Sequence, residues 1–137
     1  MGISQKCYYA IRAVFELAQA PAATAVKIAD IAERQGIPPK FLEAILAQLK
    51  GGGFVESRRG AEGGYLLVRS PRSLTLGEII RFIEGPLHPV KGPTAPNDVF
   101  APIWEAAEKA LADVYDGTNF QDLVDRSRPR AAIDFAI

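Results

Sequence analysis

Residues 54–68, FVESRRGAEGGYLLV, form two short apolar runs on either side of a glycine-rich loop that carries Arg58 and Arg59. Glycine-rich loops often bind phosphate, but the nucleotide-binding patterns G-x-G-x-x-G and G-x-x-x-x-G-K-S/T lead into a helix, and neither spacing is present here. Two strand-like runs joined by such a loop are instead typical of a β-hairpin. The sequence therefore predicts a hairpin with two arginines near its tip.

Three segments before the hairpin repeat their apolar residues at helical spacing. The first runs from Gln5 to Ala20, the second covers Ile28–Ala32 and is closed by Gly36, and the third starts after Pro38-Pro39 and ends at residues 51–53. A short helix, a tight turn and a longer helix make a helix-turn-helix candidate. Followed by a hairpin, this is a winged helix, whose third helix enters the major groove of DNA while the hairpin contacts the backbone or minor groove.

A fourth helix is expected from about Leu76 to Glu84. Thr75 can cap it, with Glu78 completing a capping box, and Gly85-Pro86 ends it. The following segment, 86–97, contains four prolines and is expected to be an extended loop.

A long helix is predicted from the capping residue Asp98 to Tyr115, with more apolar residues than one small domain covers. Such a helix favours a two-fold dimer that pairs two recognition helices on a palindromic site. The residues expected to mediate dimerisation are Ile103, Trp104, Ala107 and Leu111.

The predicted fold class is mostly α with a small β-hairpin wing (α+β). We expect a winged helix-turn-helix DNA-binding domain at residues 1–85. Residues 86–137 then supply a loop, a dimerisation helix and a C-terminal tail.

Charge is distributed unevenly although the formal net charge is zero. Residues 1–75 hold ten Lys and Arg against six Asp and Glu, whereas residues 76–137 hold six against ten. A basic first half is expected to face a polyanion.

Cys7 is the only cysteine, which excludes an intrachain disulfide and a cysteine-only metal site within one chain. This composition fits a reducing cytoplasm. Arg12 and Glu16 interrupt the apolar N-terminal stretch, so neither a signal peptide nor a membrane span is expected. One His and one Cys provide no catalytic constellation, and we do not expect an enzyme.

The chain also resembles the Rrf-two family of bacterial transcription regulators along nearly its whole length. The shared motifs are S-x-K-x-x-Y-A at residues 4–10, I-A-x-x-x-x-x-Q-G-I at 28–37, F-L-E at 41–43, G-F-V at 53–55, R-G-A-x-G-G-Y at 59–65, and L-G-E-I-I at 76–80 with E-G-P at 84–86.

This resemblance implies a homodimeric repressor bound to a palindromic operator in double-stranded DNA, with α-helical residues at the major groove and the wing at the minor groove. The residues expected to contact DNA are Ser4, Lys6, Lys40, Glu43, Ala44, Lys50, Arg58 and Arg59. Family members often carry glutamine at the position of Ala44. Because alanine offers only a methyl contact, the operator sequence cannot be transferred from relatives.

Cluster-bearing members of the family place three cysteines in the segment that corresponds to 86–97. In this chain, the only residues in or next to that segment that could bind a cluster are His88 and Asp98. We therefore expect no iron–sulfur cluster, no other metal and no cofactor. His88 is interpreted as an exposed loop residue, and Cys7 as a small buried hydrophobe rather than a redox sensor.

Among cluster-free members, the likeness is greatest to a repressor of cysteine metabolism, through E-G-P-L-x-P-V at 84–90 and the end of the chain. That end also resembles the tail of serine acetyltransferase, which docks into cysteine synthase, O-acetylserine (thiol)-lyase. Expected partner-binding residues are Asp134, Phe135, Ala136 and Ile137, as a flexible tail with its apolar side chains in pockets. The alternative is that they pack back on the dimer.

The leading hypothesis is thus a repressor of cysteine and sulfur-metabolism genes that acts without a cluster and in complex with cysteine synthase. Two alternatives stay open. One is a regulator that senses a small molecule or thiol oxidation directly, and the other is an interaction module for cysteine synthase with little DNA binding.

Overall fold

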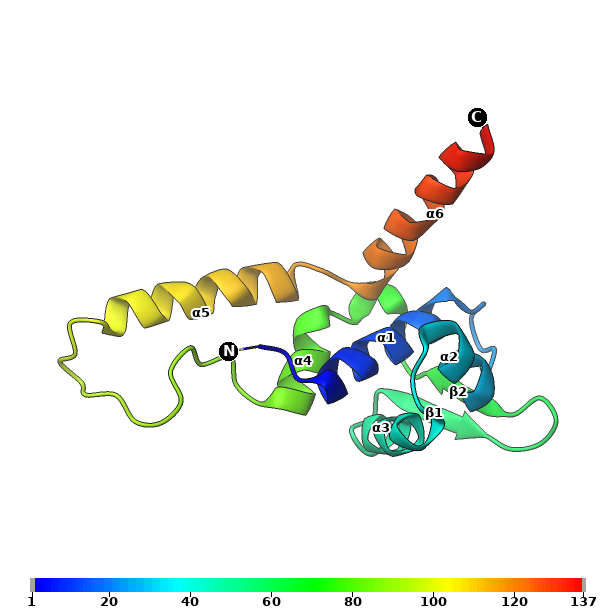
Figure 1. Ribbon diagram of the computed structural model, residues 1–137, viewed down its shortest axis with the longest axis horizontal. Coiled ribbons are helices and arrows are strands. Elements are labelled where there is room, and N and C mark those ends of the chain that lie inside the picture. The colour runs from blue at the N-terminus through cyan, green and yellow to red at the C-terminus, as the bar shows by residue number, and fades with distance from the viewer. Residues whose placement is uncertain (1, 137) are drawn as a thin grey trace.

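The computed structural model describes the backbone of residues 2–136 and the side chains of residues 2–128. Its elements are α1 (Gln5–Gln19), α2 (Ile28–Gln35), α3 (Pro39–Gly51), β1 (Val55–Arg58), β2 (Gly64–Leu67), the 3-10 helix η1 (Pro71–Ser73), α4 (Leu76–Glu84), α5 (Ala101–Asp116) and α6 (Phe120–Ala136). Helices α1–α4 and the hairpin form one body, from which α5 and α6 extend in different directions (Figure 1). The predicted class, mostly α with a hairpin wing, is confirmed.

The helix-turn-helix forms where the local signals predict it. The Ser4 hydroxyl accepts a hydrogen bond from the Cys7 amide and caps α1. Gly36 ends α2 in the left-handed region at φ 63°, where glycine has no steric penalty. Pro39 then occupies the first turn of α3, where its missing N–H costs nothing.

The core lies between α1, α3 and α4 and excludes water from an almost wholly apolar set of side chains. Its largest fully buried members are Phe120, Ile31, Leu42, Leu46, Leu49, Leu74, Ile79, Ile80, Val14, Val55 and Val124. Phe54 and Phe82 pack edge to face beside it, with ring centroids 5.0 Å apart.

The wing is an antiparallel hairpin whose register runs from Val55 opposite Leu67 to Arg58 opposite Gly64. Val26 adds a short third edge: its amide donates to the Tyr65 carbonyl at 2.8 Å and its carbonyl accepts from the Tyr65 amide at 2.9 Å. Gly64 is required here, because a Cβ would collide with the Val26 carbonyl and φ is 142°. The wing is therefore fixed relative to the segment that leads into α2.

Helix α4 begins with the predicted capping box, formed by Thr75 and Glu78, and ends at Gly85. Arg81 of α4 forms a two-point ion pair with Asp116 at the end of α5, at 2.5 and 2.9 Å. Gly77 lies beneath this pair, where a Cβ would collide with the Asp116 carboxylate. This contact holds the C-terminal end of α5 against α4.

Two boundaries differ from the prediction. Helix α5 begins at Ala101 rather than beside Asp98, because the Asp98 carboxylate accepts from the Phe100 amide at 2.9 Å and closes a turn that precedes the helix. The segment expected to be a flexible tail is helical from Phe120 to Ala136. Phe120 and Val124 are buried in the core and Leu123 packs against it. The residues from Asp125 to Arg130 are polar apart from Pro129, so the sequence shows no extended helical period here.

Candidate nucleic-acid interface

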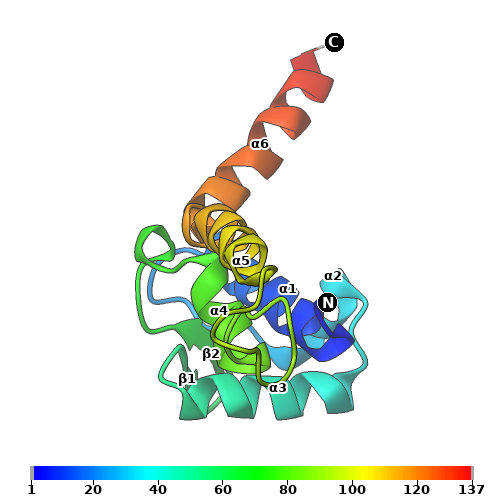
Figure 2. The same ribbon diagram turned by 90° about the vertical axis from the view of Figure 1, so that its left-hand side faces the viewer.

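Helix α3 has one buried and one exposed face, as its 3.6-residue period requires. The buried side chains are Leu42, Ile45, Leu46 and Leu49. The exposed face carries Lys40, Phe41, Glu43 and Ala44. The exposed face of α3 forms the outer surface of the molecule on that side, and Figure 2 shows that no other helix or strand covers it.

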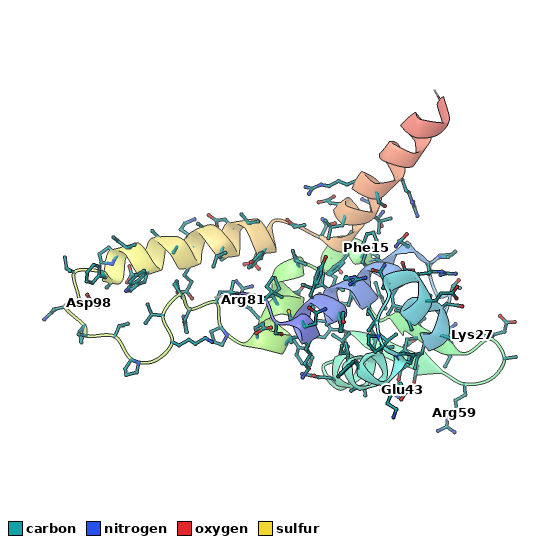
Figure 3. All side chains as sticks on the ribbon, in the orientation of Figure 1. Phe15, Lys27, Glu43, Arg59, Arg81 and Asp98 are labelled. Atoms are coloured by element: carbon teal, nitrogen blue, oxygen red, sulfur yellow. The ribbon has the colours of Figure 1, made fainter. Side chains whose placement is uncertain are left out.

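The two arginines of the wing have different surroundings. Arg58 donates from its guanidinium to the Ala23 carbonyl at 2.7 Å and so ties β1 to the loop between α1 and α2. Arg59 is exposed, and it projects on the same side of the molecule as Glu43 of α3 (Figure 3). The structure thus brings α3 and Arg59 to one side.

The start of α1 extends this surface. Lys6 lines an apolar hollow together with Phe41 and Ala44 of α3, so two predicted DNA contacts from different helices lie next to each other. Ser4 is exposed but already engaged: its hydroxyl and amide both donate to the Glu84 carboxylate, the amide at 3.0 Å. The hydrogen bond from the Ser4 hydroxyl, followed by that from its amide, lowers the pKa of Glu84.

Lys50 connects the end of α3 with the wing. Its ammonium donates to the Ser57 hydroxyl at 2.8 Å and remains exposed. All eight predicted DNA-binding residues are exposed, and of these Lys40, Glu43, Ala44 and Arg59 lie on or beside the free α3 surface.

Phe41 belongs to this surface although its side chain was not predicted to contact DNA. It is 62% exposed, which is unusual for a large aromatic side chain. The spacing could have indicated this, because Phe41 precedes the buried Leu42 and lies three positions before Ala44 on the outward face.

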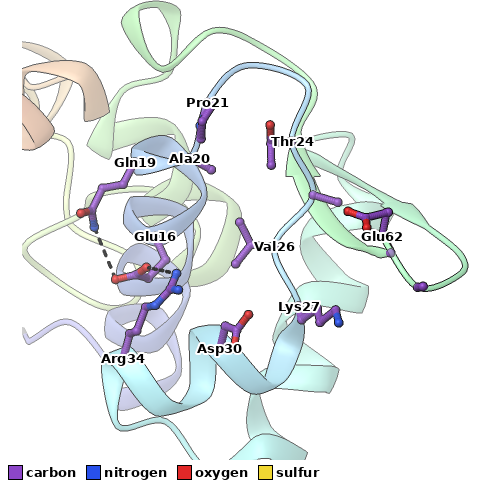
Figure 4. Close-up of a pocket in the computed structure, with 13 residues that line it drawn as sticks. Glu16, Gln19, Ala20, Pro21, Thr24, Val26, Lys27, Asp30, Arg34 and Glu62 are labelled. Carbon is purple, nitrogen blue, oxygen red and sulfur yellow. Dashed lines mark hydrogen bonds and ion pairs between the residues drawn. The ribbon is translucent and has the colours of Figure 1, made fainter.

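A polar cluster stabilises the packing of α1 against α2, and Figure 4 shows two of its members, Glu16 and Arg34. Glu16 is 9% exposed, and its carboxylate accepts from the Gln35 amide at 2.7 Å and lies 3.8 Å from Arg34. The Arg12 guanidinium donates to the Gln35 side chain at 3.0 Å. These contacts join α1 to the end of α2, beside an open hollow that reaches the wing loop at Glu62.

Helix α5 leaves apolar side chains uncovered near its start and on one face. These are Val99, Phe100, Ile103 and Val114. Of the four predicted dimerisation residues, Ile103 is 59% exposed, whereas Trp104, Ala107 and Leu111 are half-buried. Leu111 lines a hollow with Ile80 and Leu87 of the same chain, so it faces α4.

The predicted partner-binding residues Asp134, Phe135, Ala136 and Ile137 lie outside the described side chains. The backbone of the first three belongs to α6.

A helix-turn-helix followed by a hairpin wing, with the outer face of its third helix exposed, defines the class of winged-helix DNA-binding regulators. Residues 3–126 match the model of the Rrf2 family, described as iron-dependent transcriptional regulators. The chain belongs to the Rrf2 family, as its motifs predict, and it is a DNA-binding transcriptional regulator.

Relatives and solved structures agree with this assignment. A helix-turn-helix-type transcriptional regulator of Mycobacterium tuberculosis is 34% identical over 143 residues, covering 99% of this chain and 89% of the relative. The structure of CymR, the global cysteine regulator of B. subtilis, has a TM-score of 0.82 and 32% identity, covering 92% of this chain and 98% of that one. The structure of IscR of T. potens has a TM-score of 0.80 and 35% identity, covering 95% of this chain and 90% of that one.

The family description includes iron, but the side chains here do not fit an iron site. Segment 86–97 has no cysteine, and His88 is paired with Glu108 at 3.1 Å. Among the described residues, no three His, Cys, Asp or Glu side chains gather in a way that could hold a metal. Cys7 is fully buried, and burial followed by the nearby Glu84 carboxylate raises the pKa of its thiol to about 11.

Within residues 2–136 no helix has the length and apolar character needed to cross a bilayer.

Proposed function

We propose that this protein is a homodimeric, sequence-specific repressor of cysteine and sulfur-metabolism genes that acts without an iron–sulfur cluster. The observation that carries the proposal is that side chains of α3 and of the wing project from the same side of the molecule. Glu43 projects from α3 and Arg59 from the wing loop in the same direction, which suits simultaneous contact with a major groove and the adjoining minor groove (Figure 3).

Exposed apolar residues on α5 support the dimer. The side chains of Ile103 and Val114 are 59% and 62% exposed. A helix of a second copy packed on them would remove this apolar surface from water. Helix α5 projects away from the winged-helix body, so a second copy can reach it without blocking α3 (Figure 1).

Sulfur metabolism is proposed on the similarity to CymR, whose structure is that of a global cysteine regulator. The lack of thiolate ligands in segment 86–97 supports regulation without a cluster. The burial of Cys7 also argues against direct thiol sensing in this chain.

A selection from random duplex DNA with the full-length protein tests the DNA-binding part of the proposal. We expect enrichment of an inverted repeat whose half-sites are about one helical turn apart. Enrichment of an unrepeated sequence would contradict a dimer, and no enrichment would contradict sequence-specific binding.

A complex with cysteine synthase is part of the proposal and rests on the resemblance of residues 132–137 to the serine acetyltransferase tail. Calorimetry with the purified enzyme should detect binding by the full chain and at least about tenfold weaker binding after removal of Ile137. If the full chain and the truncated chain bind the enzyme with equal affinity, or if neither binds, the proposed complex with cysteine synthase through Ile137 is contradicted.

A further inference from the structure

An apolar hollow of about 350 Å³ opens on the surface between the start of α1 and α3. Tyr9, Phe41, Ala44 and Ile45 supply its apolar lining, and Gln5 and Lys6 supply polar groups from α1. Phe41 is more exposed than any other aromatic side chain among the described residues. This apolar surface contrasts with the charged side chains of Lys40, Glu43 and Arg59 on the same side of the molecule.

The side chains that face this hollow restrict what it can recognise. Phe41 and Ala44 have no hydrogen-bonding group, so they cannot make the two-point bonds that read guanine or adenine. The C5 methyl of thymine is the one apolar group that unmodified base pairs present in the major groove.

Lys6 places a positive charge next to the same hollow. An ammonium there can contact a phosphate of the strand that carries the base, while the apolar lining lies toward the base edge. A hollow with this combination suits DNA better than an apolar peptide, which would leave Lys6 without a partner.

We infer that this hollow receives the C5 methyl group of a thymine in each operator half-site, with Phe41 and Ala44 in contact with it. The inference rests on the proposed function and adds a specificity determinant to it. The half-site therefore contains one thymine whose methyl group, and not only its hydrogen-bonding edge, is read.

Deoxyuridine provides a direct test, because it differs from thymidine only by this methyl group. The probe is the duplex enriched from the random pool, with each thymine replaced in turn by deoxyuridine. We expect one position per half-site at which the replacement weakens binding by about threefold to fivefold, the value for losing one buried methyl group.

The variant Phe41→Ala identifies which side chain reads the methyl. Because Phe41 is largely exposed, its removal leaves the core intact. With this variant, the difference in affinity between the thymine and deoxyuridine duplexes should fall below about twofold, because only the contact from Ala44 remains. Val68→Ala, at another exposed apolar position, is the matched control and should keep the full difference.

The outcomes separate this inference from the proposed function. An enriched duplex in which no thymine is sensitive to deoxyuridine overturns the inference and leaves the repressor intact. Sensitivity of undiminished size in Phe41→Ala also overturns it, because Phe41 then takes no part in reading the methyl group. Failure to enrich any duplex overturns the proposed function and this inference together.

Discussion

Arg58 and Arg59 are consecutive in sequence, but of these two side chains only that of Arg58 has a hydrogen-bond partner among the residues that the structure describes, the Ala23 carbonyl at 2.7 Å. Successive residues at a strand end point in opposite directions, so anchoring Arg58 directs Arg59 outward. The pair therefore divides two tasks: one guanidinium holds the wing in place and the other is available to DNA.

Replacing Arg59 with alanine should weaken operator binding by about 1–3 kcal/mol, because a groove-inserted guanidinium supplies charge and hydrogen bonds together. A gel-shift titration measures this loss. Arg126→Ala is the matched control. Arg126 is an exposed arginine on α6, which extends away from α3 (Figure 2), so this variant should bind the operator with unchanged affinity. Equal affinities of wild type and Arg59→Ala would remove the wing from the interface.

Ile103→Glu should convert the dimer to a monomer at micromolar concentration, because it introduces a charge into the exposed apolar surface of α5. Sedimentation equilibrium measures the change. Val68→Glu, also at an exposed apolar position, should remain dimeric. A dimer that persists in Ile103→Glu would place the contact between copies elsewhere.

Cys7 should react slowly with iodoacetamide in the folded protein. Its pKa is raised from 9.0 to about 11, so the thiolate is about a hundredfold less populated at pH 8, and burial restricts access further. The rate should rise toward pH 11 and become ordinary in denaturant. Because Cys7 is the only cysteine, mass spectrometry assigns all labelling to it, and rapid labelling of the native protein would reopen direct thiol sensing.

Asp116→Asn should lower the free energy of unfolding by about 0.2–1 kcal/mol at pH 7, the range for a partly exposed ion pair. The hydrogen bonds from Arg81 lower the pKa of Asp116 in the folded state. Its contribution is therefore present above the ordinary aspartate pKa and is lost as the pH falls through the lowered value. Urea unfolding should show the wild-type advantage at pH 7 and not at pH 2, and an advantage of equal size at both would contradict an ionic origin.

The sequence predicted α1 to α4 and the wing because each carries its own start and stop signal, such as the capping box at Thr75 or the left-handed Gly36. Helix α6 was not predicted, since among its described side chains Phe120, Leu123 and Val124 are the ones that pack on the core, too few to show a helical period. The buried carboxylate of Glu16 was also beyond sequence analysis. Its partner Gln35 lies nineteen positions away, and only the packing of α1 against α2 brings them together.

Within the candidate interface, the exposure of the charged residues could be predicted from their type and their place in the winged-helix order, whereas their contacts with DNA stay a prediction. The division between Arg58 and Arg59 could not, because it depends on where the Ala23 carbonyl lies. The hollow at Phe41 likewise needs two helices, and a single helix period gives no sign of it.

Binding affinities for three duplexes, measured at one fixed salt concentration, show whether a dimer reads a specific sequence through α3 and the wing. The enriched inverted repeat is compared with a scrambled duplex of the same composition and with a single half-site. We expect the inverted repeat to bind at least about a thousandfold more tightly than the scrambled duplex, with the half-site in between. Equal affinity for all three duplexes would contradict sequence-specific binding by a dimer.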